Sequence, residues 1–185
     1  GFSRGRVRSS ARYSTARMAA DALAVLSHVV GTHPASAPLV HVVGHSMGSL
    51  IAIELASRHG ARVDQLVLTG PTAAMPVHPE LLRAAADREE KAVDLMMDWG
   101  HGPAGHTGGN IAAGTWAKGT AKRMVMPRVA DGTLGIDLAA SNAYAGGGEA
   151  LSRITAKTTV IVSQRDRMTA PKNGLAVAAA IDSPS

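Results

Sequence analysis

The feature that most constrains this chain is Gly44-His45-Ser46-Met47-Gly48, inside LVHVVGHSMGSLIAIEL. A nearly unbroken apolar run precedes the serine and an apolar helical pattern follows it, with almost no residues left for a connection. The serine therefore occupies a sharp strand-to-helix turn with a positive φ, the G-x-S-x-G nucleophile-elbow pattern. We expect Gly44 and Gly48, without Cβ atoms, to let strand and helix cross closely and to push the hydroxyl out at the carboxyl end of the sheet.

The helix that begins after Ser46 supplies backbone amide groups that can act as hydrogen-bond donors. The first amide groups of a helix have no partner within it and point toward its N-terminal end. The backbone N–H of Met47 is therefore the predicted donor to an oxyanion that develops on a bound carbonyl group. A serine placed beside such a donor is typical of a nucleophile in acyl transfer, provided that a base removes its proton.

Short apolar runs alternate with helical stripes along much of the chain. Strands are expected at 39–43, 65–69 and 158–163, and helices at 14–30, 48–59 and 171–181. This alternation predicts an α/β fold, with a parallel sheet that carries helices on both faces. Three strands leave open edges, so we expect the isolated 185-residue chain to aggregate or to stay partly unfolded.

The interval from 71 to 157 has no clear strand pattern and is too long for an ordinary crossover. It contains helical spacing at 79–98 and 131–144, and a glycine-rich loop at 100–109. We interpret it as a helical insertion above the sheet. The expected division is a first core part at 1–71, a helical cap or lid at 72–156 and a second core part at 157–185.

Composition narrows the classes of function. The chain has no cysteine, which excludes disulfides and thiolate metal sites, and no histidine pair has metal-site spacing, so we expect neither a metal nor a cofactor. No apolar stretch reaches the roughly 18 residues of a membrane span, and a cytoplasmic location is favoured. The net charge of +5 includes an N-terminal cluster of four arginines: Arg4, Arg6, Arg8 and Arg12. No aromatic residues alternate with them, which favours a solvated terminal segment over a nucleic-acid site.

The segment Gly44-His45-Ser46-Met47-Gly48 resembles the nucleophile elbow of the α/β-hydrolase superfamily, among its cap-bearing serine esterase-like members. QLVLTGP at 65–71 resembles the strand after the elbow helix, and TTVIVSQRDRMTAP at 158–171 resembles the strand whose tip carries the catalytic acid. GFSRG at 1–5 faintly resembles the Gly-Phe-Gly-Arg-Ser turn that lies one helix before the elbow strand. The resemblance implies a partial α/β-hydrolase fold, with Ser46 as nucleophile and Asp166 as triad acid.

The position of Asp166 supports this role independently of the resemblance. It follows a buried strand, at the carboxyl edge of the sheet where Ser46 is also expected. A carboxylate placed there can hold a histidine in the correct tautomer and stabilise its cation. The alternative interpretation is a solvated loop aspartate between two arginines.

The histidine of the triad is absent from the sequence. The resemblance implies a histidine after the acid, but none of the 19 residues after Asp166 is histidine, and all eight histidines precede it. His45 is next to the serine, yet the elbow directs neighbouring side chains elsewhere; His101 and His106 belong to the glycine-rich loop. We therefore expect an internal fragment of an esterase-like enzyme, inactive by itself, with its first strands and its histidine outside these residues.

The leading hypothesis is a serine hydrolase that acts on a small carboxylic ester or related acyl substrate. Candidates to line the substrate pocket within the insertion are Met75, Met96, Met97, Trp99 and Met124. Two alternatives stay open: a non-catalytic ligand-binding pseudo-hydrolase, and a cofactor-free carbon–carbon hydrolase or perhydrolase on the same scaffold. A nucleic-acid partner is not expected, and the sequence does not define the oligomeric state.

Overall fold

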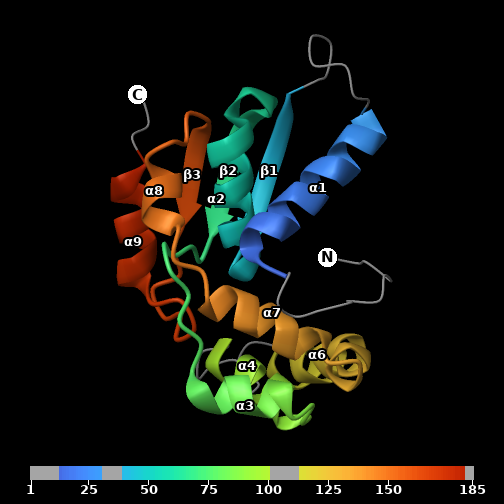
Figure 1. The fold of residues 1–185 in the computed structure, drawn as a ribbon. Coiled ribbons are helices and arrows are strands. Elements are labelled where there is room, and N and C mark those ends of the chain that lie inside the picture. Colours follow the sequence, from blue (N-terminus) through green and yellow to red (C-terminus); the bar gives the residue numbers. More distant parts are fainter. Residues whose placement is uncertain (1–12, 31–38, 101–112, 182–185) are drawn as a thin grey trace.

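The computed structural model describes residues 13–30, 39–100 and 113–181. Its sheet has three parallel strands in the order β1-β2-β3 (Figure 1). The strands are β1 (Val40–His45), β2 (Val63–Thr69) and β3 (Lys157–Ile161). Each predicted strand is present, with its bounds shifted by a few residues, and the predicted parallel α/β arrangement is confirmed.

Among the described residues, four helices pack on one side of the sheet. They are α1 (Thr15–Val30), α2 (Met47–His59), α8 (Gly147–Leu151) and α9 (Pro171–Ala180). Their apolar residues form one cluster with the side chains of a single face of the sheet, including Leu66 and Leu68 of β2. Both leucines are fully buried because α2 crosses directly over the strand.

The opposite face of the sheet is open among the described residues. Val43, Val67 and Thr159 lie side by side in the register of the three strands, so their side chains share that face. Val43 is 72% exposed, and Ile161 on the same face is 47% exposed. The helical cover that the sequence pattern predicts on this second face is therefore not found in the described part of the chain.

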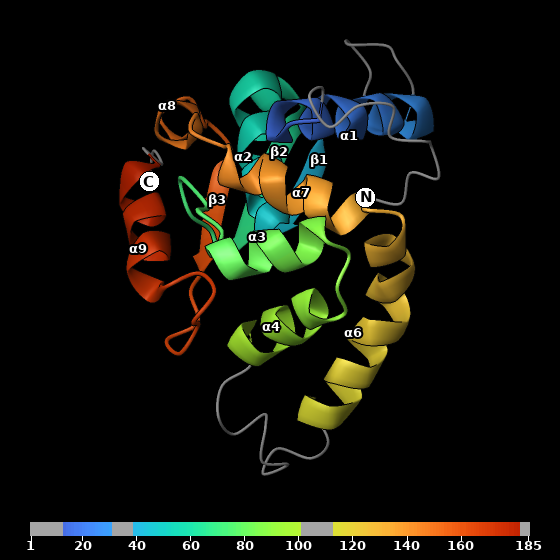
Figure 2. The same ribbon diagram turned by 60° about the horizontal axis from the view of Figure 1, so that its bottom comes forward.

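Residues between β2 and β3 form a second group of helices. They are α3 (Pro79–Ala86), α4 (Lys91–Gly100), α6 (Ala113–Ala130) and α7 (Thr133–Asn142). They pack around a separate apolar cluster that includes Leu81, Val93 and Val129. Figures 1 and 2 show this group beyond the carboxyl ends of the strands. The interval contains no strand in its described residues.

Two features of this interval differ from the sequence prediction. The single helical pattern at 79–98 is split into α3 and α4, because Arg88 adopts a φ of 60° and its guanidinium donates to the Ala130 carbonyl oxygen at 3.2 Å. Helices α6 and α8 were not predicted, and α8 joins the sheet-side cluster although it lies within the range assigned to the insertion. The glycine-rich loop and the N-terminal arginines lie outside the described residues, apart from Gly100 at the end of α4.

The two connections between the sheet and the insertion run next to each other. A Cβ atom on Gly147 would lie 1.9 Å from the carbonyl oxygen of Ala73, so only glycine permits this contact. Nearby, the backbone N–H of Val77 donates to Asn142 Oδ1 at 2.9 Å. The chain therefore leaves the sheet and returns to it at one place.

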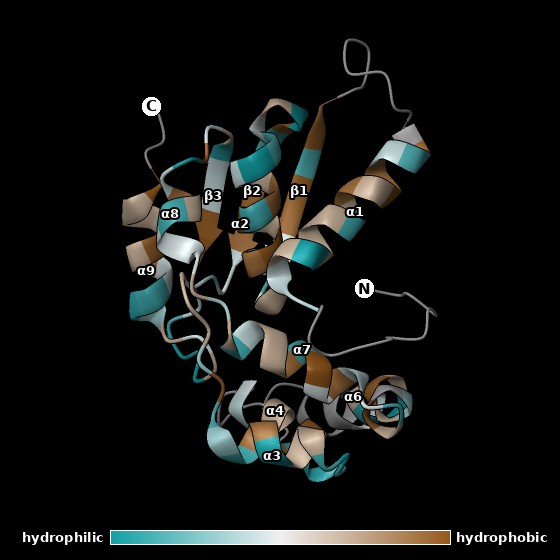
Figure 3. Ribbon diagram, in the orientation of Figure 1, coloured by the Kyte–Doolittle hydropathy of each residue, from teal (hydrophilic) through white to brown (hydrophobic). Residues whose placement is uncertain are grey.

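The helices have the hydropathy pattern of segments that pack against an apolar core. In Figure 3, β1 is mostly brown (apolar), and the helices carry both brown and teal (polar) residues. No helix in the described ranges combines the length and the apolar character that crossing a membrane requires.

Candidate active site

Ser46 is the single residue between the end of β1 and the start of α2, and its backbone is strained. Its φ is 52° and its ψ is −122°, a combination that non-glycine residues rarely adopt. Hydrogen bonds on both sides hold it there. Its N–H donates to the Thr69 carbonyl oxygen at 3.0 Å, and its own carbonyl oxygen accepts from the N–H and the hydroxyl of buried Ser49. Strain of this kind persists only where the surroundings over-determine it.

The two glycines of the motif have different roles. A Cβ atom on Gly44 would lie 2.6 Å from the Gly48 carbonyl oxygen and 2.8 Å from the Cβ of Ala52. Strand β1 and helix α2 therefore cross at a contact that only glycine allows. A Cβ atom on Gly48 would meet nothing within 4 Å. The expected steric requirement thus holds for Gly44, whereas Gly48 contributes its backbone to the contact and its missing side chain would face open space.

The N-terminal end of α2 supplies an amide donor next to Ser46. Within the described residues the N–H of Met47 donates to no other group, because the first amides of a helix have no carbonyl four residues before them in the helix. Ser46 and Met47 both line the same pocket. A carbonyl oxygen bound next to the serine would meet a donor that needs no rearrangement.

Asp166 lies in the loop between β3 and α9, and three donors fix its carboxylate. Oδ1 accepts from the N–H groups of Met168 at 2.8 Å and Thr169 at 2.9 Å, and Oδ2 accepts from the Thr169 hydroxyl at 2.9 Å. Thr169 is buried and lines the pocket with Ser46, and a Cβ atom on Gly70 would lie 3.5 Å from Asp166 Oδ2. The loop therefore holds the carboxylate beside the end of β2, and Oδ2, which accepts one hydrogen bond, keeps capacity for a further donor.

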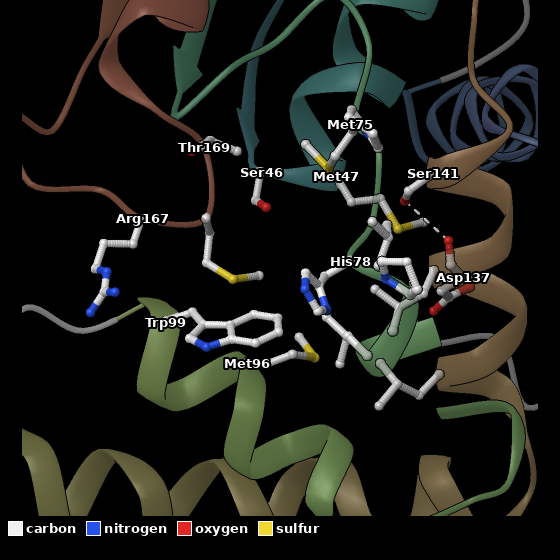
Figure 4. A pocket seen from close by; sticks show the side chains of 17 residues that line it. Ser46, Met47, Met75, His78, Met96, Trp99, Asp137, Ser141, Arg167 and Thr169 are labelled. Carbon is white, nitrogen blue, oxygen red and sulfur yellow. Dashed lines mark hydrogen bonds between the residues drawn. The ribbon is translucent and has the colours of Figure 1, made fainter. Parts of the chain in front are cut away.

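The pocket lies between the sheet and the insertion and has a volume of about 810 Å³. Its wall is mostly apolar, and Figure 4 shows the side chain of Met96 beside the ring of Trp99. Met75, Met96 and Trp99 line it as expected. Met97 packs instead in the core of the insertion, and Met124 is exposed on α6, so neither belongs to the wall.

A histidine that no sequence motif singles out, His78, lines this pocket. His78 precedes α3 and caps it: its Nδ1 accepts a hydrogen bond from the Glu80 N–H at 3.2 Å. Its ring makes an edge contact with Trp99, with centroids 5.1 Å apart. Figure 4 shows the imidazole pointing into the pocket across from Ser46. The only local signal was a histidine immediately before a helix that starts with proline.

A buried carboxylate joins α2 to the end of the insertion. Glu54 is 3% exposed and accepts hydrogen bonds from Arg58 Nε at 2.7 Å and from the Tyr144 hydroxyl at 2.9 Å. Burial, followed by the hydrogen bond to Glu54, raises the pKa of the Tyr144 phenol well above its ordinary value. The separate hydrogen bond from Arg58 Nε to Glu54 raises the pKa of the Arg58 guanidinium. This network, with two partners for one buried carboxylate, ties α2, the helix that follows Ser46, to the segment that follows α7.

The other described histidines lie outside the pocket. His45 is exposed at the end of β1, and the Nε2 of His41 lies 3.0 Å from Asp64 Oδ2 on the surface. His101 and His106 lie outside the described residues. Within the described ranges, no histidine nitrogen forms a hydrogen bond with Ser46 or with Asp166.

A parallel sheet with a strained serine between its first strand and the following helix defines the α/β-hydrolase class. The sequence profile of a family within this class, described as serine aminopeptidase, S33, matches residues 1–112. The chain therefore belongs to this family of α/β hydrolases. No curated protein gives a significant match.

Solved structures of other hydrolases have the same fold. A thermophilic esterase is 26% identical, with a TM-score of 0.70 over 92% of this chain and 62% of that one. The enol-lactonase from Burkholderia xenovorans LB400 is 18% identical, with a TM-score of 0.70 over 92% of this chain and 62% of that one. Est816, an N-acyl homoserine lactone degrading enzyme, is 21% identical, with a TM-score of 0.70 over 96% of this chain and 67% of that one. The chain thus spans less than two thirds of the length of the first two.

Proposed function

We propose that the protein hydrolyses carboxylic esters or related acyl compounds with Ser46 as the nucleophile. One observation carries the proposal: the backbone of Ser46 is held at a φ of 52° while the residue lines a largely apolar pocket. A serine in an ordinary turn needs no such strain. In a strand-to-helix turn at the carboxyl end of a parallel sheet, the strain serves to present an attacking oxygen.

The proposed reaction proceeds in two stages. Ser46 Oγ forms a bond to the carbonyl carbon while a base takes its proton, and the negative charge that develops on the carbonyl oxygen is stabilised by the Met47 N–H. One such donor contributes about 3 kcal/mol to stabilisation of the transition state. The carbon–oxygen bond to the alcohol then breaks, and the alcohol leaves with the proton from the base. Water attacks the acyl-serine in the same way and releases the carboxylic acid.

Asp166 is the proposed acid of the triad. Its carboxylate is fixed by backbone and hydroxyl donors, and Oδ2 retains a lone pair for an imidazole N–H. In that role it holds the base in the productive tautomer and stabilises its cation. We assign residues 72–156 as the cap, whose helices complete the wall of the acyl pocket.

The general base is proposed to be a histidine outside these 185 residues. His78 shares the pocket with Ser46, but its Nδ1 lone pair is engaged by the Glu80 N–H. A neutral imidazole then carries its proton on Nε2 and has no free lone pair for the serine proton. The geometry of His78 therefore does not suit the role of base.

The experiment is active-site labelling with a fluorophosphonate, followed by peptide mass spectrometry. The experiment uses the full-length protein that the gene encodes. We expect a single label on Ser46, loss of label and of ester hydrolysis in Ser46→Ala, and full labelling in the control Ser57→Ala, whose hydroxyl donates to Glu54 on the same helix. Label on another residue would reject the assignment.

A ligand-binding protein without turnover is the second candidate, favoured by the lack of a described histidine bonded to Ser46. It predicts saturable binding of acyl compounds with neither labelling nor hydrolysis. A perhydrolase on this scaffold would instead convert acetate and hydrogen peroxide to peracid without turning over esters.

A further inference from the structure

The polar groups of the pocket are unequally available to a ligand. The Thr169 hydroxyl proton is used on Asp166 Oδ2, and the Ser141 hydroxyl donates to the Asp137 carbonyl oxygen at 3.0 Å. Arg167 lines the rim, and Figure 4 shows its guanidinium directed away from Ser46. Available hydrogen-bond donors inside this apolar wall are therefore few, and their positions restrict which substrates fit.

In the neutral ring of His78, the contacts determine which nitrogen carries the proton. The Glu80 N–H at 3.2 Å can bond to Nδ1 only if that nitrogen is unprotonated, so in the neutral ring the proton is on Nε2. The edge contact with Trp99 limits rotation of the ring. Because Nδ1 is bonded to the backbone of α3, Nε2–H is the edge of the ring left for the pocket, into which the imidazole projects (Figure 4).

We propose that His78 Nε2–H is a specificity-determining donor that binds an acceptor oxygen of the substrate at a distance from the scissile carbonyl. This inference rests on the proposed function. The substrate class that fits is an ester whose acyl group is mainly hydrocarbon, matching the methionines and Trp99, and carries one ether, ring or carbonyl oxygen opposite His78. An acyl chain without that oxygen displaces water from the donor and offers it no hydrogen bond in return, which disfavours binding of that chain.

The effect is modest because His78 is exposed to solvent. A single neutral hydrogen bond corresponds to a preference of about 2- to 10-fold. The matched substrates are 4-nitrophenyl hexanoate and its isosteres 4-nitrophenyl 3-ethoxypropanoate and 4-methoxybutanoate, in which one methylene is replaced by oxygen. We expect at least one ether ester to exceed the hexanoate in kcat/KM by this factor.

Two variants separate the two nitrogens of the ring. Asparagine can replace Nδ1 as the cap acceptor but does not reach the pocket, so His78→Asn should keep the melting temperature and bring the ether-to-hexanoate ratio close to one. Glutamine places an amide N–H near Nε2 without the cap, so His78→Gln should keep a preference for the ether ester and melt at a lower temperature. His28→Asn, on the exposed last turn of α1, is the control that leaves the ratio unchanged.

A second readout does not depend on turnover. In ¹⁵N NMR of histidine-labelled protein, His78 should show the Nε2–H tautomer, and 4-methoxybutanamide or 3-ethoxypropanamide should shift the Nε2 resonance more than hexanamide does. An Nδ1–H tautomer, or an ether-to-hexanoate ratio that His78→Asn leaves unchanged, would overturn the inference. If the protein hydrolyses none of the esters, the proposed function fails, and the tautomer and amide shifts still decide the role of His78.

Discussion

A Cβ atom on Gly44 would lie 2.6 Å from the carbonyl oxygen of Gly48, whereas a Cβ atom on Gly48 would meet no atom within 4 Å. The two glycines of one short motif therefore differ in what they contribute to packing. Gly44 sets the distance between β1 and α2, and that distance places Ser46 at the tip of the turn. The pair offers a matched test of the elbow.

We expect Gly44→Ala to lower the free energy of unfolding by about 3 kcal/mol, because the added methyl group must displace backbone in a contact that cannot expand. Gly48→Ala should leave stability unchanged or raise it by about 0.5 kcal/mol, since alanine suits a helix better than glycine. Urea unfolding followed by circular dichroism measures both. Equal destabilisation by the two substitutions would contradict the geometry.

The strain at Ser46 predicts that function and stability oppose each other there. Ser46→Gly should raise the free energy of unfolding by about 1 kcal/mol, because glycine adopts positive φ without a steric penalty. Ser46→Ala, which keeps the strain, should leave stability close to that of the native protein. Both should lack esterase activity. A Ser46→Gly protein no more stable than Ser46→Ala would show that the backbone is relaxed.

Asp166→Asn separates the chemical role of the carboxylate from its structural role. The amide oxygen can still accept from the N–H groups of Met168 and Thr169, so the melting temperature should change little. If Asp166 orients the base, kcat should fall by about 10⁴-fold. Thr169→Val is the comparison: it removes a donor from a buried contact and should lower stability by about 1 kcal/mol. Retained kcat in Asp166→Asn would remove it from the triad.

The Tyr144–Glu54 hydrogen bond predicts a stability change at alkaline pH. Tyr144 has a raised pKa in the folded protein, so the protonated phenol stabilises the fold at every pH below its unfolded value of about 10. This contribution is lost as pH rises from 10 toward the folded pKa. The difference in free energy of unfolding between the native protein and Tyr144→Phe, about 1 kcal/mol at pH 8, should shrink steadily above pH 10. A difference that grows with pH would contradict the assignment.

The open face of the sheet predicts self-association of the 185-residue chain. Val43 and Ile161 expose apolar surface that association would bury. Val43→Thr should reduce aggregation at fixed concentration, measured by light scattering, because threonine keeps the β-branched shape and adds a hydroxyl group. The control is Val63→Thr at a buried position of β2, which should instead reduce stability. If the native 185-residue chain stays monomeric at high concentration, the prediction of self-association is wrong.

The parts of the fold that the sequence predicted are those set by local pattern. Ser46 lies in five residues whose composition fixes the turn, and the Asp166 loop follows a strand whose end determines which edge it reaches. Pro79–Ala86 was found as the start of a helix, but its end was not. Arg88 ends it through a contact with Ala130, which no local pattern reveals.

The parts that escaped prediction depend on distant contacts. Helix α6 contains Gly119 and Pro127 and has little amphipathic periodicity, so its formation depends on packing against α4 and α7. The pocket residue His78 is placed by α3 and by its contact with Trp99, 21 positions away in the sequence. The open sheet face could not be predicted either, because the strands β1 and β3 have apolar residues on both sides.

The contact between Ala73 and Gly147 has a consequence for how such a protein can diversify. The two connections between the sheet and the insertion touch each other. The 73 residues between Ala73 and Gly147 can therefore be exchanged for a different unit, or for a short loop, without changing the spacing of β2 and β3. Ser46 and Asp166 lie outside that stretch, and His78 and Trp99 lie within it. The proposed nucleophile and acid are thus encoded in stretches of the gene separate from the proposed specificity residue, so that one set can be inherited while the other is replaced.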